Sequence, residues 1–96
     1  TTSYVITPVA LPAGAFFEAV NPVTNKIYVT DNASPNGTVS VIDANNANAV
    51  TTIAVAAGVG WVAVNPVTNK IYVTDDASTV SVIDANNANA VTTIAV

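Results

Sequence analysis

The chain has 96 residues, of which 51% are apolar and only 8% charged, and six acidic residues against two lysines give it a net charge of −4. This balance disfavours binding to nucleic acid phosphates or to an anionic membrane surface, and the absence of Cys, Met and His excludes disulfides, zinc–thiolate sites and histidine acid–base catalysis. No apolar run approaches the length of about 20 residues that a membrane-spanning helix needs.

Residues 3–11 are rich in β-forming residues, and they align without a gap on residues 47–55 when both are counted back from the next Asn-Pro pair. We therefore expect an extra strand here, a diverged copy of the last strand of a repeated unit. Pro8 has no N–H to donate to a neighbouring strand, which favours an edge position or a bulge. Residues 12–14 are expected to form a turn.

The rest of the chain consists of two copies of one unit. Residues 19–31 recur unchanged at residues 63–75, and residues 38–55 recur at residues 79–96. The spacing of the copies matches the period of about 40–50 residues that is typical of a β-propeller blade. The predicted divisions are the extra strand and turn (residues 1–14), a first blade (residues 15–55) and a second blade (residues 56–96).

Each unit contains four short predicted strands. The first is an apolar run without polar alternation, which is typical of a strand covered on both faces. The Asn-Pro-Val-Thr-Asn sequence that follows predicts a hairpin turn, because Pro fixes φ and the second Asn tolerates positive φ. In the second strand Ile and Val alternate with Tyr and Thr, and an acidic residue at the end of the third strand is expected to bond the backbone of an Asn-rich turn. The expected strands are residues 15–20, 26–30, 38–43 and 49–55 in the first unit, and residues 59–64, 70–74, 79–84 and 90–96 in the second.

Two blocks of the unit, Asn-Pro-Val-Thr-Asn-Lys-Ile-Tyr-Val-Thr-Asp and Thr-Val-Ser-Val-Ile-Asp, each occur twice. Together they resemble the repeat of the YVTN-family β-propellers, known from bacterial and archaeal surface-layer and secreted proteins. Asp31 and Asp75 depart from the family, because they stand where it has Asn. The resemblance implies an all-β fold of four-stranded antiparallel blades, and an extracellular or cell-surface location if the chain is natural rather than designed. It also implies a closed ring of about seven blades, whereas this chain contains two.

Two blades do not close a ring, and each leaves an apolar face exposed. A small domain normally carries about a quarter charged residues, so the shortage of charge also predicts a covered surface. We therefore expect a non-catalytic module that binds copies of itself, with three or four chains closing a ring of six or eight blades. The alternatives are a surface filament built by strand exchange through residues 3–11, and a fragment of a larger ligand-binding surface propeller. The residues expected to mediate self-association are Tyr4, Val5, Ile6, Val9, Leu11, Phe17, Trp61, Ile94 and Val96.

No cluster in the sequence is typical of a catalytic, cofactor or small-molecule site, and a propeller enzyme would lack His and Arg. Asp31, Asp75 and Asp76 are expected in loops, where carboxylates bind calcium, but Asp is a common turn residue and no Asp-x-Asp-x-Asp-Gly loop is present. Glu18, whose counterpart is Val62, is expected at a solvated rim or, alternatively, in a central channel. None of these residues is predicted to hold a metal.

Asn32 and Asn36 each begin an Asn-x-Ser/Thr sequence, the acceptor pattern for N-glycosylation. Asn36 is followed by Gly, a pair that is equally typical of a hairpin turn. Phe17 and Trp61 stand at matching positions of the two units, and they are expected to pack between blades rather than to stack on a ligand.

Overall fold

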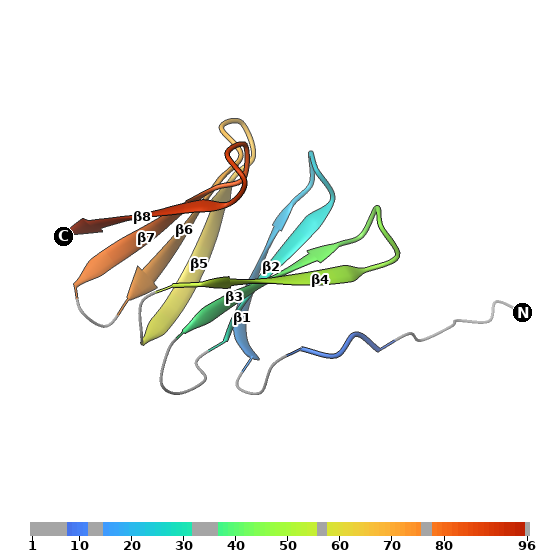
Figure 1. Ribbon diagram of the computed structural model, residues 1–96, viewed down its shortest axis with the longest axis horizontal. Coiled ribbons are helices and arrows are strands. Elements are labelled where there is room, and N and C mark those ends of the chain that lie inside the picture. Colours follow the sequence, from blue (N-terminus) through green and yellow to red (C-terminus); the bar gives the residue numbers. More distant parts are fainter. Residues whose placement is uncertain (1–7, 12–14, 32–36, 56–57, 76–77, 96) are drawn as a thin grey trace, which may run out of the picture.

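The computed structural model describes residues 8–11, 15–31, 37–55, 58–75 and 78–95. Within these residues the chain forms eight strands in two four-stranded antiparallel sheets and has no helix, and therefore none that could span a membrane, so the all-β class is confirmed. In each sheet the strands follow the order of the chain (Figure 1). The first sheet contains β1 (Ala15–Asn21), β2 (Lys26–Asp31), β3 (Thr38–Asp43) and β4 (Ala49–Ala54). The second contains β5 (Val59–Asn65), β6 (Lys70–Asp75), β7 (Thr79–Asp84) and β8 (Ala90–Ala95).

The two sheets have the same strand register, so identical residues occupy equivalent positions. Tyr28 lies opposite Val41 in the first sheet, and Tyr72 lies opposite Val82 in the second. The first strand of each sheet also contains a register shift at the same place, as a β-bulge produces. Each residue of one sheet can therefore be compared directly with its copy in the other.

The Asn-Pro-Val-Thr-Asn segments form the predicted hairpin turns between the first and second strands of each sheet. Asn21 Oδ1 accepts a hydrogen bond from the backbone N–H of Val23 at 3.0 Å, and Asn25 has a φ of 59°. Asn65 makes the same kind of turn contact, and Asn69 has a φ of 57°. Asn suits both positions because its short side chain bonds nearby backbone and because it tolerates positive φ.

The Asn-rich turns between the third and fourth strands are tied to these hairpins by side chains. Asp43 Oδ1 accepts the backbone N–H of Asn45 at 3.0 Å, which confirms the role expected for an acidic residue at the end of the third strand. Asn25 Nδ2 donates to Asn45 Oδ1 at 2.9 Å, and Asn69 donates to Asn86 in the same way at 2.8 Å. The two turns at this end of each sheet are thus linked to each other.

Each sheet has two faces, because residues alternate between them along every strand. We call the face that carries the strand-two Tyr and Thr the tyrosine face, and the face that carries the strand-two Ile and Val the isoleucine face. In the first sheet the tyrosine face includes Ala19, Asn21, Tyr28, Thr30, Val39, Val41 and Ile53. The isoleucine face of this sheet includes Glu18, Val20, Ile27, Val29, Ser40 and Ile42. In the second sheet the tyrosine face includes Ala63, Asn65, Tyr72, Thr74, Val80, Val82 and Ile94, and the isoleucine face includes Val62, Val64, Ile71, Val73, Ser81 and Ile83. Phe17 and Trp61 lie at the register shifts of β1 and β5.

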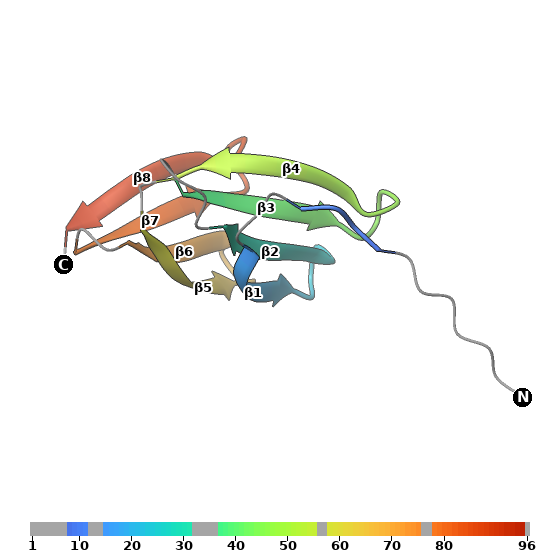
Figure 2. The same ribbon diagram turned by 90° about the horizontal axis from the view of Figure 1, so that it is seen from below.

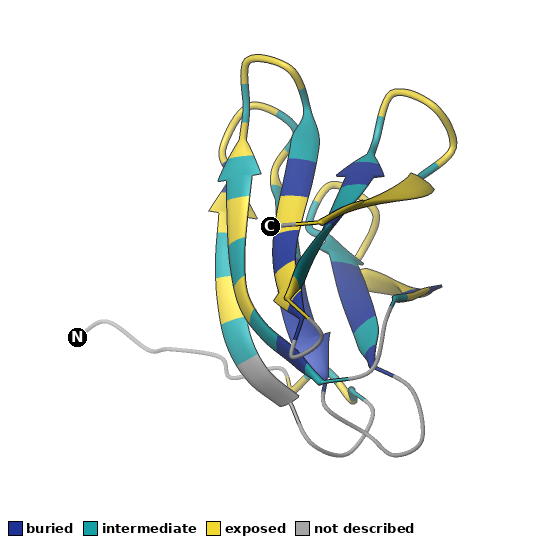
Figure 3. Ribbon diagram, turned by 90° about the vertical axis from the view of Figure 1, so that its left-hand side faces the viewer, coloured by how far each residue is buried: buried dark blue, intermediate teal, exposed yellow. Residues whose placement is uncertain are grey.

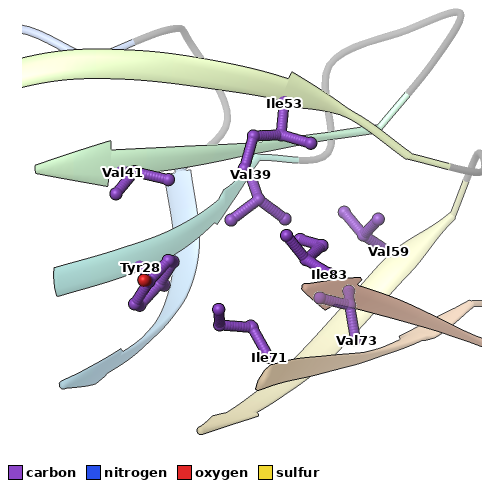
Figure 4. Close-up of a cluster of buried hydrophobic side chains, with 8 residues drawn as sticks. All are labelled: Tyr28, Val39, Val41, Ile53, Val59, Ile71, Val73 and Ile83. Atoms are coloured by element: carbon purple, nitrogen blue, oxygen red, sulfur yellow. The ribbon is translucent and has the colours of Figure 1, made fainter. Parts of the chain in front are cut away.

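The two sheets pack with the tyrosine face of the first on the isoleucine face of the second. The buried cluster between them contains Tyr28, Val39, Val41 and Ile53 from the first sheet and Val59, Ile71, Val73 and Ile83 from the second (Figure 4). Strand β5 contacts β1 and β2. Strands β1 and β5 lie at one side of the molecule and β4 and β8 at the other (Figure 2). The core therefore lies between two copies of one sheet, and it uses a different face of each.

Residues 8–11 lie in no strand, so the extra N-terminal strand predicted for residues 3–11 is not formed in its described part. Pro8 has no backbone N–H to contribute to a ladder. In addition, each unit already supplies the fourth strand of its own sheet, as β4 or β8. The rest of the predicted strand, including Tyr4, Val5 and Ile6, lies outside the described residues.

Candidate self-association surface

Among the described residues, two side-chain hydrogen bonds cross between the sheets and constrain how the sheets are oriented. Thr30 Oγ1 donates to the backbone carbonyl of Gly60 at 3.2 Å, and Asn21 Nδ2 donates to Asn69 Oδ1 at 3.0 Å. Both donors lie on the tyrosine face of the first sheet. Burial of apolar surface is non-directional, whereas a hydrogen bond requires a particular distance and angle. These two bonds therefore specify one orientation of the packed sheets.

A ring stack joins β1 to β5. The rings of Phe17 and Trp61 have centroids 3.8 Å apart and planes inclined by 26°. Trp61 remains 66% exposed despite this contact. An aromatic ring has two faces on which another ring can stack, so most of the Trp61 surface is left for a further partner.

The tyrosine face of the second sheet is not covered by any of the described residues. Tyr72 is 36% exposed and Ile94 is 48% exposed, whereas their copies in the first sheet, Tyr28 and Ile53, are 0% and 8% exposed. Buried and exposed residues alternate along β6 as a result (Figure 3). Soluble monomers rarely expose apolar patches larger than a few hundred Å². This face is therefore a candidate for contact with another molecule.

The isoleucine face of the first sheet is also partly uncovered. Val20 is 53% exposed, and Ile27 and Ile42 are half-buried. Their copies Ile71 and Ile83 are fully buried, because the first sheet packs on them. The residues are identical and the strand register is the same, so the difference in exposure comes from packing alone.

The residues that the sequence predicted for self-association are divided among several places. Ile94 lies on the tyrosine face of the second sheet, and Phe17 and Trp61 stack on each other between β1 and β5. Val9 and Leu11 are half-buried and lie in no strand. Val96 lies outside the described residues, as do Tyr4, Val5 and Ile6.

Sequence reasoning did not single out Tyr72 or Val20, although both have large exposed apolar side chains on the uncovered faces. The signal that points to Tyr72 is present in the sequence. Two copies of one sheet that pack with different faces leave one face of each kind uncovered, so one of the two identical tyrosines has to be exposed. For the same reason, one isoleucine face has to stay uncovered, and this exposes Val20.

Asp31 and Asp75 are the last residues of β2 and β6, which corrects the prediction that they lie in loops. Asp75 Oδ2 accepts hydrogen bonds from the Ser81 and Thr79 hydroxyls at 2.9 and 3.0 Å, and Asp31 makes the same two contacts in the first sheet. Both carboxylates are buried, and each ties its second strand to its third. The described residues contain no group of three acidic, His or Cys side chains that suits a metal. Asp76 lies outside them.

Glu18 is exposed on the isoleucine face of the first sheet.

Burial, and to a smaller extent the charge of Asp43, raises the pKa of the Tyr28 phenol, so this side chain is neutral in the core. The described residues enclose no pocket. The two glycosylation candidates, Asn32 and Asn36, lie outside the described residues.

The candidate site is thus a pair of uncovered sheet faces: the tyrosine face of the second sheet and the isoleucine face of the first. No protein-family model matches the chain, and no curated protein or solved structure compared with it matches either.

Proposed function

We propose that this protein is a non-catalytic structural module that assembles with copies of itself into a closed β-propeller ring of three or four chains. One observation carries the proposal. A tyrosine face and an isoleucine face are buried against each other inside the chain, while a second face of each kind, built from nearly the same residues, is uncovered. If each sheet is one blade, three or four chains supply six or eight blades, within the range of about 4–8 blades found in propellers.

The apolar side chains on the uncovered faces supply the free energy for association. Full burial of one large apolar side chain contributes about 1.5–3 kcal/mol. Tyr72 and Ile94 contribute from one face, Val20 and Ile27 from the other, and the exposed Trp61 contributes from the edge at β5. Together they are comparable to the cost of association, about 4–15 kcal/mol. A closed ring covers both faces of every chain, whereas an open dimer leaves one face of each kind exposed.

The absence of a catalytic role is supported by the residue types. The chain has no His, Cys or Arg, and the buried carboxylates Asp31 and Asp75 accept hydrogen bonds from hydroxyl groups of their own sheets. The resemblance to YVTN-family repeats is the support for a location at the cell surface.

The proposal is tested by sedimentation of the purified chain together with negative-stain imaging. The expected result is a species of three or four times the chain mass of 9.7 kDa that appears as a ring. Deletion of residues 1–11 is expected to leave the rings intact. Fibres that disappear on this deletion would support strand exchange instead, and a chain that stays monomeric at every concentration would contradict self-assembly.

A further inference from the structure

We infer that copies of this chain join head to tail: the tyrosine face of the second sheet in one chain packs on the isoleucine face of the first sheet in the next. We base this contact on the self-assembly proposed above, and it defines which faces of two copies meet. The occupant is a second copy of this chain, because the chain already contains this interface once, between its own two sheets.

The faces that are free match the faces that are already packed. Three strands of the first sheet are identical in sequence to their copies in the second, and β1 and β5 differ only in their first four residues, Ala-Phe-Phe-Glu at 15–18 and Val-Gly-Trp-Val at 59–62. At the register shift of the first strand this difference replaces Phe17 by Trp61, which keeps an aromatic ring. The second sheet therefore presents nearly the same surface that the first sheet uses inside the chain.

The polar groups that would cross the new interface are in place. Asn21 uses its Oδ1 in its own turn and donates through Nδ2 to Asn69 across the internal interface. Asn65 makes the same turn contact and is exposed, and its Nδ2 makes no hydrogen bond within the described residues. In the contact between copies, Asn65 Nδ2 would donate to Oδ1 of Asn25 of the partner subunit, because Asn25 is the copy of Asn69. Asn25 and Asn69 each donate Nδ2 within their own sheet, so the Oδ1 atom of both is the one that accepts.

Thr74 provides the second crossing bond. It is the exposed copy of Thr30, whose hydroxyl donates to the Gly60 carbonyl across the internal interface. In the next copy the equivalent acceptor is the backbone carbonyl of Phe16 of the partner subunit.

Trp61 supplies the aromatic contact. Phe17 occupies one part of its ring surface, and 66% of the side chain is exposed. In the head-to-tail arrangement this exposed surface stacks on Phe17 of the partner subunit. Each junction then contains one Phe–Trp stack, as the internal interface does.

A two-fold pairing does not satisfy both surfaces. If two copies met through their tyrosine faces, the isoleucine face of each first sheet would stay uncovered, with Val20 and the half-buried Ile27 in solvent. A head-to-tail contact repeats from one chain to the next and covers every face when the series closes.

Two variants that block opposite faces test the direction of the contact. Ile94→Arg places a charge on the tyrosine face of the second sheet, at the position where its copy Ile53 is buried. Val20→Arg does the same on the isoleucine face of the first sheet, where its copy Val64 packs against the core. Each is expected to weaken self-association at least about 100-fold. An equimolar mixture is expected to form a one-to-one dimer, because each variant retains the face that the other has lost.

The control is Val67→Arg, which adds the same charge at a turn position that is 91% exposed and is expected to assemble like the unaltered chain. Circular dichroism checks that all variants keep their sheets, and Tyr72→Arg with Ile27→Arg serves as a second pair if one of the first does not. A Val20→Arg chain that dimerises alone would overturn the head-to-tail contact in favour of a two-fold one. Assembly unaffected by either variant would overturn this surface while the proposed function stands. An unaltered chain that is always monomeric would overturn both.

Discussion

Ile53 and Ile94 are the same residue in two strands of identical sequence, and replacing each by alanine is expected to have different effects. Ile53 belongs to the buried cluster and is 8% exposed, while Ile94 is 48% exposed. Ile53→Ala is expected to lower the free energy of unfolding of the single chain by about 2–5 kcal/mol, because it removes buried methyl groups and leaves a cavity. Ile94→Ala is expected to lower it by about half as much, because nearly half of that side chain is already in solvent.

Assembly is expected to bury the Ile94 side chain to the same extent as that of Ile53. A decrease from 48% to 8% exposure removes about two fifths of the side-chain surface from water, and full burial of such a side chain contributes about 1.5–3 kcal/mol. Each junction therefore gains about 1 kcal/mol from this residue. Ile94→Ala is expected to weaken each junction about fivefold, and the cavity that it leaves at the interface adds to this loss.

The two effects are separated by two measurements on the same pair of variants. Urea unfolding in dilute solution reports the stability of the single chain, and sedimentation velocity over a dilution series reports association. We therefore expect that Ile53→Ala mainly changes the free energy of unfolding and that Ile94→Ala mainly changes association. An Ile94→Ala chain that loses as much unfolding free energy as Ile53→Ala and assembles normally would refute this expectation.

Three further predictions concern single residues. Glu18→Val is expected to strengthen association about tenfold, because a carboxylate loses hydration at a position where Val62 packs against the internal core; weaker association in a dilution series would contradict this. Asp75→Ala leaves two hydroxyls without their acceptor and is expected to lower the free energy of unfolding by about 1–3 kcal/mol, so an unchanged urea midpoint would argue against its role. Ala47 has a φ of 52°, and Ala47→Gly is expected to raise stability by about 1 kcal/mol. The control Ala49→Gly, within β4, is expected to lower it.

The strand order and the turns could be predicted because their signals are local. The repeated unit defines four strands, and Asn25 and Asn69 mark turns where the backbone has positive φ. The pairing of sheet faces could not be predicted in the same way. Alternation along β2 and β6 defines two faces, but both are apolar, and only packing decides which face of one sheet meets which face of the other.

The two incorrect expectations have a common cause. The strand expected over residues 3–11 depends on a free sheet edge, and residues 8–11 pair with none. Asp31 was expected in a loop because Asp is a common turn residue, but the pairing of β2 with β3 extends through it and places two hydroxyls beside its carboxylate. In both cases the outcome depends on a partner strand, which local composition does not specify.

A native mass spectrum of the assembled chain tests the central claim most directly. Closure through repeated head-to-tail interfaces predicts one dominant species of three or four times 9.7 kDa, unchanged as the concentration rises. A spectrum that contains only the single chain, or a series of masses that grows without limit with concentration, would contradict it.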